Sequence, residues 1–259
     1  RIMRVNAWYL RVRTTAVLRS TSALRYVPEK KIQCRNEEKM NIERKTTKMV
    51  LTGIFSAIII VMASIPFLGF IPLGVINVTI LQVPVIIGAI LLGPKYGAFL
   101  GFMFGLCSFL NATLRPSSLS AFVFTPFLSN GNLLSLIVCF VPRILIGVTS
   151  YYSYKWVKGH FDKKNREKDK KARRAGESKA LLIAGVVGSM TNTLLVMNFI
   201  FLFFTDTYAQ VMGVTGGAAS LYWFILGIIG INGVPEAIAS ALITAAVLKV
   251  LLHIRPAHA

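Results

Sequence analysis

Six apolar runs follow one another along the chain from Met49 onward. They cover residues 49–70, 74–93, 96–114, 133–157, 180–204 and 221–252. A helix needs about 20 predominantly apolar residues to cross the hydrocarbon core of a bilayer, and each run has or approaches that length. The pattern therefore predicts an all-α integral membrane protein with six transmembrane helices over residues 49–254.

The last apolar run is longer than one bilayer width and contains helix-breaking residues. Gly230, Asn232, Gly233 and Pro235 lie together near its middle. Glycine weakens a helix, and proline removes a backbone N–H donor and crowds the preceding turn. We expect a break at this point, with the membrane-crossing helix mainly beyond it.

Basic residues are concentrated outside the apolar runs. Residues 1–48 contain 13 Lys and Arg against 4 acids, residues 155–179 contain 11 against 4, and the rest of the chain contains 5 against 2. Lys and Arg accumulate in cytoplasmic segments beside membrane helices. Six spans place both basic segments and both termini on the cytoplasmic side. The net charge of +19 therefore indicates membrane topology rather than nucleic-acid binding.

Composition and motifs exclude several classes of function. With 54% apolar and 15% charged residues, the chain has too little charge to cover a soluble domain. The sequence shows no Gly-rich phosphate loop, no HExxH motif, no paired Cys ligands and no plausible Ser/His/Asp set. We expect no enzyme activity, no metal site and no cofactor.

The segment that precedes Met49 differs in composition from the runs that follow. Its first 39 residues hold scattered Arg, Ser and Thr, without an apolar stretch long enough for a signal-peptide core. A mitochondrial presequence and translated upstream DNA both have this composition. We interpret residues 1–48 as a disordered or artefactual extension, residues 158–179 as a cytoplasmic loop and residues 255–259 as a cytoplasmic tail.

Two charged residues lie within the predicted membrane helices. Arg143 follows Pro142 in the fourth run, and Glu236 follows Pro235 at comparable depth in the sixth. A charge at such a depth costs on the order of several kcal/mol unless it is paired or hydrated. An ion pair between the two would join their helices. The alternative, which the sequence leaves open, is that one of them faces a substrate cavity.

Polar residues also recur on single helix faces. Asn232, Glu236, Ser240 and Thr244 recur every fourth residue, which places them on one stripe of the sixth helix. This stripe should face protein or water rather than lipid.

The fifth predicted helix has two asparagines with different orientations. Asn192 shares a face with Gly185, Gly188 and Ser189, whereas Asn198 is rotated about 120° away by helix geometry. Asn192 is therefore the better candidate to face the interior.

Polar residues at the outer ends of the second and third predicted helices complete a set of candidate ligand contacts. Arg115 is the one basic residue predicted outside, so it could bind a carboxylate ligand or reach lipid phosphates instead. The candidate ligand-binding residues are Asn77, Gln82, Asn111, Arg115, Arg143, Asn192, Asn232 and Glu236.

Small residues recur at a spacing of four in the third predicted helix. Gly97, Gly101 and Gly105 form two overlapping GxxxG patterns. This spacing lets another helix backbone approach closely. We expect it to serve packing within the chain.

The chain resembles the substrate-binding S components of energy-coupling-factor (ECF) vitamin transporters over residues 48–252. The similarity rests on Gly-Pro-Lys-Tyr-Gly at 93–97 and on several shorter motifs. These are the small-residue face of Thr52, Gly53, Ser56 and Ala57, the sequences Pro142-Arg143-Ile144-Leu145 and Asn192-Thr193, and Asn232-Gly233-Val234-Pro235-Glu236. Residues 83–102 look most like the pantothenate branch of that family.

The resemblance implies a multi-pass protein of the bacterial cell membrane that binds a vitamin from outside. A transmembrane T component and two ATPase subunits would supply the energy. Family members dock through an AxxxA face on the first helix, and the matching positions here are Gly53 and Ala57, with Thr52 and Ser56 alongside. In such proteins the vitamin site lies near the outer surface, between the later helices and the outer loops.

Pantothenate is the leading candidate vitamin, because its carboxylate, hydroxyls and amide match a site of Arg, Asn and Gln. Riboflavin, folate or a thiamine precursor are the alternatives within the same class. A self-sufficient secondary transporter is usually built from repeated halves with carboxylates at midplane. A membrane-embedded enzyme would need clustered acids or His. The sequence shows no repeat, and Glu236 is the one acid within the spans.

Overall fold

The computed structural model describes residues 29–65, 70–73, 76–116, 120–164 and 170–254. Side-chain positions are described for residue 40 and for residues 42–65, 80–116, 120–163 and 174–251. The chain divides into two units, Arg1–Met49 and Val50–Ala259, and helix α2 (Glu29–Ser64) contributes residues to both. The candidate site lies in the second unit.

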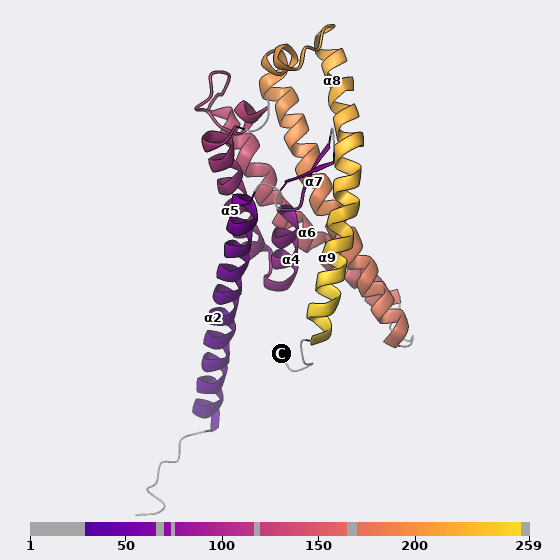
Figure 1. The fold of residues 1–259 in the computed structure, drawn as a ribbon. Coiled ribbons are helices and arrows are strands. Elements are labelled where there is room, and N and C mark those ends of the chain that lie inside the picture. Colours follow the sequence, from indigo (N-terminus) through magenta and orange to yellow (C-terminus); the bar gives the residue numbers. More distant parts are fainter. Residues whose placement is uncertain (1–28, 66–69, 74–75, 117–119, 165–169, 255–259) are drawn as a thin grey trace, which may run out of the picture. The chain divides into compact units, whose positions relative to one another are not determined.

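Helices make up most of the described chain (Figure 1). After α2 come α4 (Gln82–Leu92), α5 (Pro94–Leu114), α6 (Leu134–Lys164), α7 (Lys170–Met212), α8 (Gly217–Ile228) and α9 (Val234–Ile254). Among the described residues, 5 segments are long and apolar enough to cross a membrane, namely 42–64, 94–114, 134–163, 174–212 and 217–251. The predicted class of fold, a helical membrane protein, is confirmed.

The second apolar run does not form the one long helix that the sequence predicted. Its described residues form strand β2 (Ile76–Thr79) and then the 11-residue helix α4. Strand β2 pairs antiparallel with β1 (Phe70–Leu73), so that Phe70 faces Thr79 and Leu73 faces Ile76. Apolar and polar residues alternate in Ile76–Thr79, and Ile, Val and Thr favour strands. The run is therefore a hairpin strand followed by a short helix.

The break expected in the last apolar run is a local widening of the helix. A π-helical turn, η2 (Ile229–Gly233), connects α8 to α9, and the three elements form one long column (Figure 1). Pro235 has no N–H, and its ring crowds the carbonyl of the residue four positions earlier, Ile231. A wide turn at that carbonyl relieves the crowding. Apolar sequence runs on both sides of the turn, over 217–251, instead of mainly beyond it.

Glycines on α5 allow close contact with α6. A Cβ atom at Gly101 would collide with the backbone oxygen of Arg143, and one at Gly147 would collide with the backbone of Gly97. The thiol of Cys139 donates to the carbonyl oxygen of Gly105 at 3.3 Å. The GxxxG spacing of α5 therefore serves packing within the chain, as expected.

Two apolar clusters form the interior of the second unit. The α4 cluster gathers around Val83–Ile90 and includes Leu100, Phe104, Ile146, Leu181 and Leu248. The α8 cluster gathers around Leu221 and Ile225 and includes Phe122, Val138, Val196, Ile200 and Phe204. Phe122 belongs to the 3₁₀ turn η1 (Ala121–Phe124), and its carbonyl oxygen accepts a hydrogen bond from Ser135 at 3.0 Å. The loop after α5 therefore folds onto α6.

Replacing Gly101 with alanine should weaken the contact between α5 and α6. The added methyl group would force the two backbones apart, at a cost of about 1–3 kcal/mol. Gly227→Ala on α8 is the matched control, because a Cβ atom there would meet nothing within 4 Å. Thermal unfolding of the purified protein in detergent should show a lower midpoint for Gly101→Ala than for Gly227→Ala. Equal midpoints would contradict the assigned packing.

Candidate functional site

A layer of polar side chains, buried except for the half-buried Asn232, lies between the two apolar clusters. Along α6, Arg143 lies between Val138 of the α8 cluster and Ile146 of the α4 cluster. On α7 the order along the chain is reversed, and the polar residues lie between Leu181 of the α4 cluster and Val196 of the α8 cluster. We call this set the polar layer; it comprises Gln82, Arg143, Ser189, Asn192, Thr193, Asn232, Glu236 and Ser240.

Gln82 connects three helices within the polar layer. Its side chain is 0% exposed, and its Nε2 donates to Ser189 Oγ at 2.8 Å and to Ser240 Oγ at 2.7 Å. Gln82 begins α4, Ser189 is on α7 and Ser240 is on α9. A buried amide of this kind is costly unless it is hydrogen-bonded, so these bonds fix how the three helices meet.

Glycines bring α7 close enough to its neighbours for these bonds to form. A Cβ atom at Gly185 would lie 2.6 Å from the Cα atom of Ala241, so the backbones of α7 and α9 nearly touch. A Cβ atom at Gly188 would collide with Ser150 Oγ on α6. The glycines that share a face with Asn192 therefore pack the helix, while Ser189 and Asn192 supply polar groups.

Arg143 satisfies a backbone group that Pro142 leaves without its helical partner. Within a helix, the carbonyl of Val138 would accept from the N–H of residue 142, and proline has none. Arg143 Nη1 donates to that carbonyl oxygen at 2.8 Å. The side chain is only 6% exposed, and its guanidinium lies 4.7 Å from the ring centre of Phe124 and 5.7 Å from that of Phe104.

The expected ion pair between Arg143 and Glu236 is not formed directly. Between described residues, the ion pair within 4 Å is Lys158–Glu177, at 2.7 Å. The reason is local, because the carbonyl of Val138 and two aromatic rings hold the guanidinium. Both side chains are buried, Arg143 on α6 and Glu236 on α9.

Gln82, Arg143 and Asn192 each carry a buried polar atom that has no hydrogen-bond partner among the described residues. These atoms are Gln82 Oε1, Arg143 Nε and Asn192 Oδ1. An unsatisfied buried polar group costs about 1–3 kcal/mol, so such groups are expected to meet water or a ligand. Two acceptors and a cationic donor suit a small polar solute. The described residues contain no group of three or more His, Cys, Asp or Glu that could hold a metal ion.

The remaining candidate residues have different positions. Asn111 Nδ2 donates to the carbonyl oxygen of Ala63 on α2 at 3.0 Å, and Arg115 is exposed at the end of α5. Asn232 is half-buried in η2, whereas the side chain of Asn77 lies outside the described residues.

Asn198 is exposed and donates to its own helix at Leu194, in agreement with its expected orientation. Thr193, which the sequence analysis named in a family motif but not as a candidate ligand contact, has its methyl group against Gly233 of η2.

Comparisons with known proteins identify the family. Residues 47–248 match the family described as ECF transporter, substrate-specific component. A protein of Lactococcus lactis subsp. cremoris named pantothenic acid transporter PanT is 33% identical over 223 residues, which cover 82% of this chain and 96% of the relative. A Leuconostoc mesenteroides protein named pantothenate transporter PanT is 32% identical over 216 residues, which cover 81% and 94%. The chain belongs to the ECF S components.

Membership in this family establishes the general role of the chain. An ECF S component is the vitamin-binding subunit of an uptake system, and it is a multi-pass protein of the cell membrane. The family and both relatives are transporters rather than enzymes. The polar layer of this S component is therefore a candidate vitamin site.

The small-residue face of the first membrane helix of this S component is divided between two sides. Thr52 and Ser56 are buried, as are Ile59 and Ala63 farther along the same helix. Gly53 and Ala57 are exposed, and a Cβ atom at Gly53 would meet nothing within 4 Å. Thr52 and Ser56 therefore face the protein, and Gly53 and Ala57 form a smooth outward strip.

Pro142 and Arg143 should show coupled effects on the stability of this S component. Arg143→Ala leaves the carbonyl of Val138 without a donor and should cost about 1–3 kcal/mol. Pro142→Ala restores a backbone N–H for that carbonyl, so Arg143→Ala should cost less in the Pro142→Ala background. Thermal unfolding of the parent, the two single variants and the double variant gives the coupling free energy between the two positions. An equal cost in both backgrounds would show that Arg143 does not replace the missing N–H.

Proposed function

We propose that this S component binds pantothenate in the polar layer and transfers it in association with a T component and two ATPase subunits. The observation that carries the proposal is the similarity to two pantothenate transporters over nearly their full length. The polar layer supports it, because a water-soluble vitamin requires hydrogen-bonding groups within an otherwise apolar fold.

The chemistry of pantothenate suits the groups that the layer offers. Arg143 is a buried cation for the carboxylate, and its Nε atom is available as a donor. Gln82 Oε1 and Asn192 Oδ1 can accept from the hydroxyls or the amide N–H. Phe104 and Phe124 lie over the guanidinium, and the burial of Arg143 strengthens its interaction with an anion.

Further residues could extend this site toward the outside. Asn77 lies on β2, which contacts η2 and α9, so we include it together with Asn232 and Glu236. Arg115 is exposed at the end of α5 and could attract a carboxylate to an entrance. Asn111 is assigned to helix packing, because its amide already donates to α2. In this proposal the termini and the basic loop at 158–179 face the cytoplasm, and the vitamin enters from the opposite side.

The outward strip of Gly53 and Ala57 is our proposed docking surface for the T component. Small residues let two helices approach closely and slide without interlocking side chains. Bulky residues such as Ile54 and Ile58 lie beside the strip and are also exposed. The strip is therefore a local depression on an apolar helix.

The vitamin assignment is tested by the purified chain and by intact cells. Pantothenate should raise the unfolding temperature of the full chain in detergent, whereas riboflavin, folate and thiamine precursors should leave it unchanged, because only a bound ligand stabilises the folded state. Stabilisation by another vitamin alone would replace pantothenate in the proposal. In cells, uptake of labelled pantothenate should require the T component and ATPases. Uptake without them would indicate a self-sufficient secondary transporter.

The docking surface is tested by enlarging its side chains. Gly53→Leu and Ala57→Leu should strongly reduce pantothenate uptake while binding by the isolated subunit is preserved, because bulk on the strip blocks only the partner. Gly227→Leu and Ala246→Leu are matched controls at exposed positions on α8 and α9. If all four variants transport equally well, the strip is not the docking surface.

A further inference from the structure

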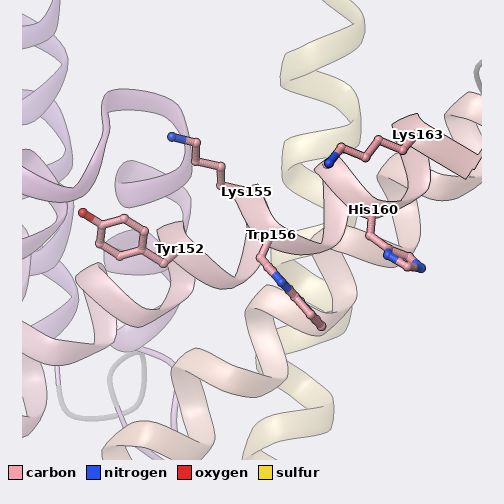
Figure 2. A pocket seen from close by; sticks show the side chains of 6 residues that line it. Tyr152, Lys155, Trp156, His160 and Lys163 are labelled. Atoms are coloured by element: carbon pink, nitrogen blue, oxygen red, sulfur yellow. The ribbon is translucent and has the colours of Figure 1, made fainter.

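A surface hollow follows one face of α6, remote from the polar layer along the helix. It is lined by Tyr152, Lys155, Trp156, Gly159, His160 and Lys163 (Figure 2). These positions recur at intervals of three and four residues, so they share one side of the helix. Gly159 contributes no side chain, and a Cβ atom there would meet nothing within 4 Å. The hollow is therefore open at this glycine.

The lining residues are basic or aromatic. Lys155 and Lys163 are exposed, and none of the described residues that line the hollow is Asp or Glu. Trp156 is 77% exposed, and its ring stacks at 25° on that of His160, with 6.4 Å between the ring centres. Tryptophan and tyrosine are enriched where the apolar membrane core meets the headgroups. The combination suits an anionic group attached to an apolar body.

The length of α6 places this hollow at a membrane boundary. The helix has 31 residues, which correspond to about 46 Å, whereas the hydrocarbon core is about 30 Å thick. The helix begins at Leu134 within the apolar part of the chain, so its last third extends beyond the core. Lys155 to Lys163 belong to that last third, and Tyr152 lies just before it.

The opposite face of the same helix segment is occupied by protein. Lys158 Nζ donates to Glu177 Oε1 on α7 at 2.7 Å and to Tyr154 Oη at 3.0 Å. These bonds tie α6 to α7 and orient the hollow away from α7. Lysines on the two faces therefore have different roles, because Lys158 joins helices whereas Lys155 and Lys163 face outward.

We propose that the hollow binds the headgroup of an anionic phospholipid such as phosphatidylglycerol. Lys155 and Lys163, two turns apart on the helix, donate to the phosphate oxygens. Tyr152 and Trp156 pack against the glycerol and the first acyl carbons. Gly159 leaves room for the headgroup to approach the backbone. The lipid is thereby held against the S component at the end of α6.

The test uses the fluorescence of Trp156 in the full chain. The chain has 3 Trp, at positions 8, 156 and 223, so Trp8→Phe with Trp223→Phe leaves Trp156 as the one indole. This protein is reconstituted in phosphatidylcholine vesicles that contain a fixed fraction of brominated phosphatidylglycerol or of brominated phosphatidylcholine. Brominated chains quench nearby indole. We expect quenching to indicate about a fivefold preference for the brominated phosphatidylglycerol.

Charge-matched variants decide whether the hollow is responsible. Lys155→Gln with Lys163→Gln should abolish the preference. Lys95→Gln with Lys249→Gln removes the same charge from exposed positions on α5 and α9 and should leave the preference unchanged. Equal quenching by the two lipids in the parent protein would overturn the proposal. A preference that survives in Lys155→Gln/Lys163→Gln would overturn it as well.

Discussion

A bilayer offers no water to a buried polar group, so such a group must find its partners within the protein or in a ligand. The hydrogen bonds of Gln82 to Ser189 and Ser240 show this constraint most clearly, because one amide joins the helices α4, α7 and α9. Apolar side chains fill the interior on both sides of the polar layer. The layer therefore sets how the helices meet, and it also concentrates hydrogen-bonding groups at one level of the fold.

Both charged residues of this layer directly follow a proline. Pro142 leaves the carbonyl of Val138 without its helical donor, and the next residue, Arg143, supplies a side-chain donor instead. Pro235 crowds the carbonyl of Ile231 inside the π-helical turn η2, and the next residue, Glu236, lies in the polar layer. In each pair the proline disturbs a helix at the position where a charged side chain enters the interior. The backbone change that each proline causes therefore lies next to a charged side chain of the candidate site.

The sequence predicted the helical membrane fold well, because runs of apolar residues report directly on membrane crossing. It also placed Asn192 inward and Asn198 outward, because a helix has a fixed rotation per residue. The hairpin of β1 and β2 was missed, since a short apolar run does not distinguish a strand from a helix. The prediction of a direct Arg143–Glu236 ion pair was wrong. Arg143 donates instead to the carbonyl oxygen of Val138, which lacks a helical donor because residue 142 is proline. Which vitamin binds depends on atomic distances that spacing along the chain does not specify.

The central claim is that the polar layer binds the vitamin as well as holding the helices together. Asn192 and Asn198 test it, since both lie on α7, but one is buried with Oδ1 unpartnered and the other is exposed. The measurement is equilibrium binding of labelled pantothenate to the purified chain carrying Asn192→Leu or Asn198→Leu, with thermal unfolding as the check on folding. Leaving the vitamin's buried donor without its acceptor costs about 1–3 kcal/mol, which predicts roughly five- to 150-fold weaker binding for Asn192→Leu and unchanged binding for Asn198→Leu. Equal affinities for the two folded variants would contradict the account.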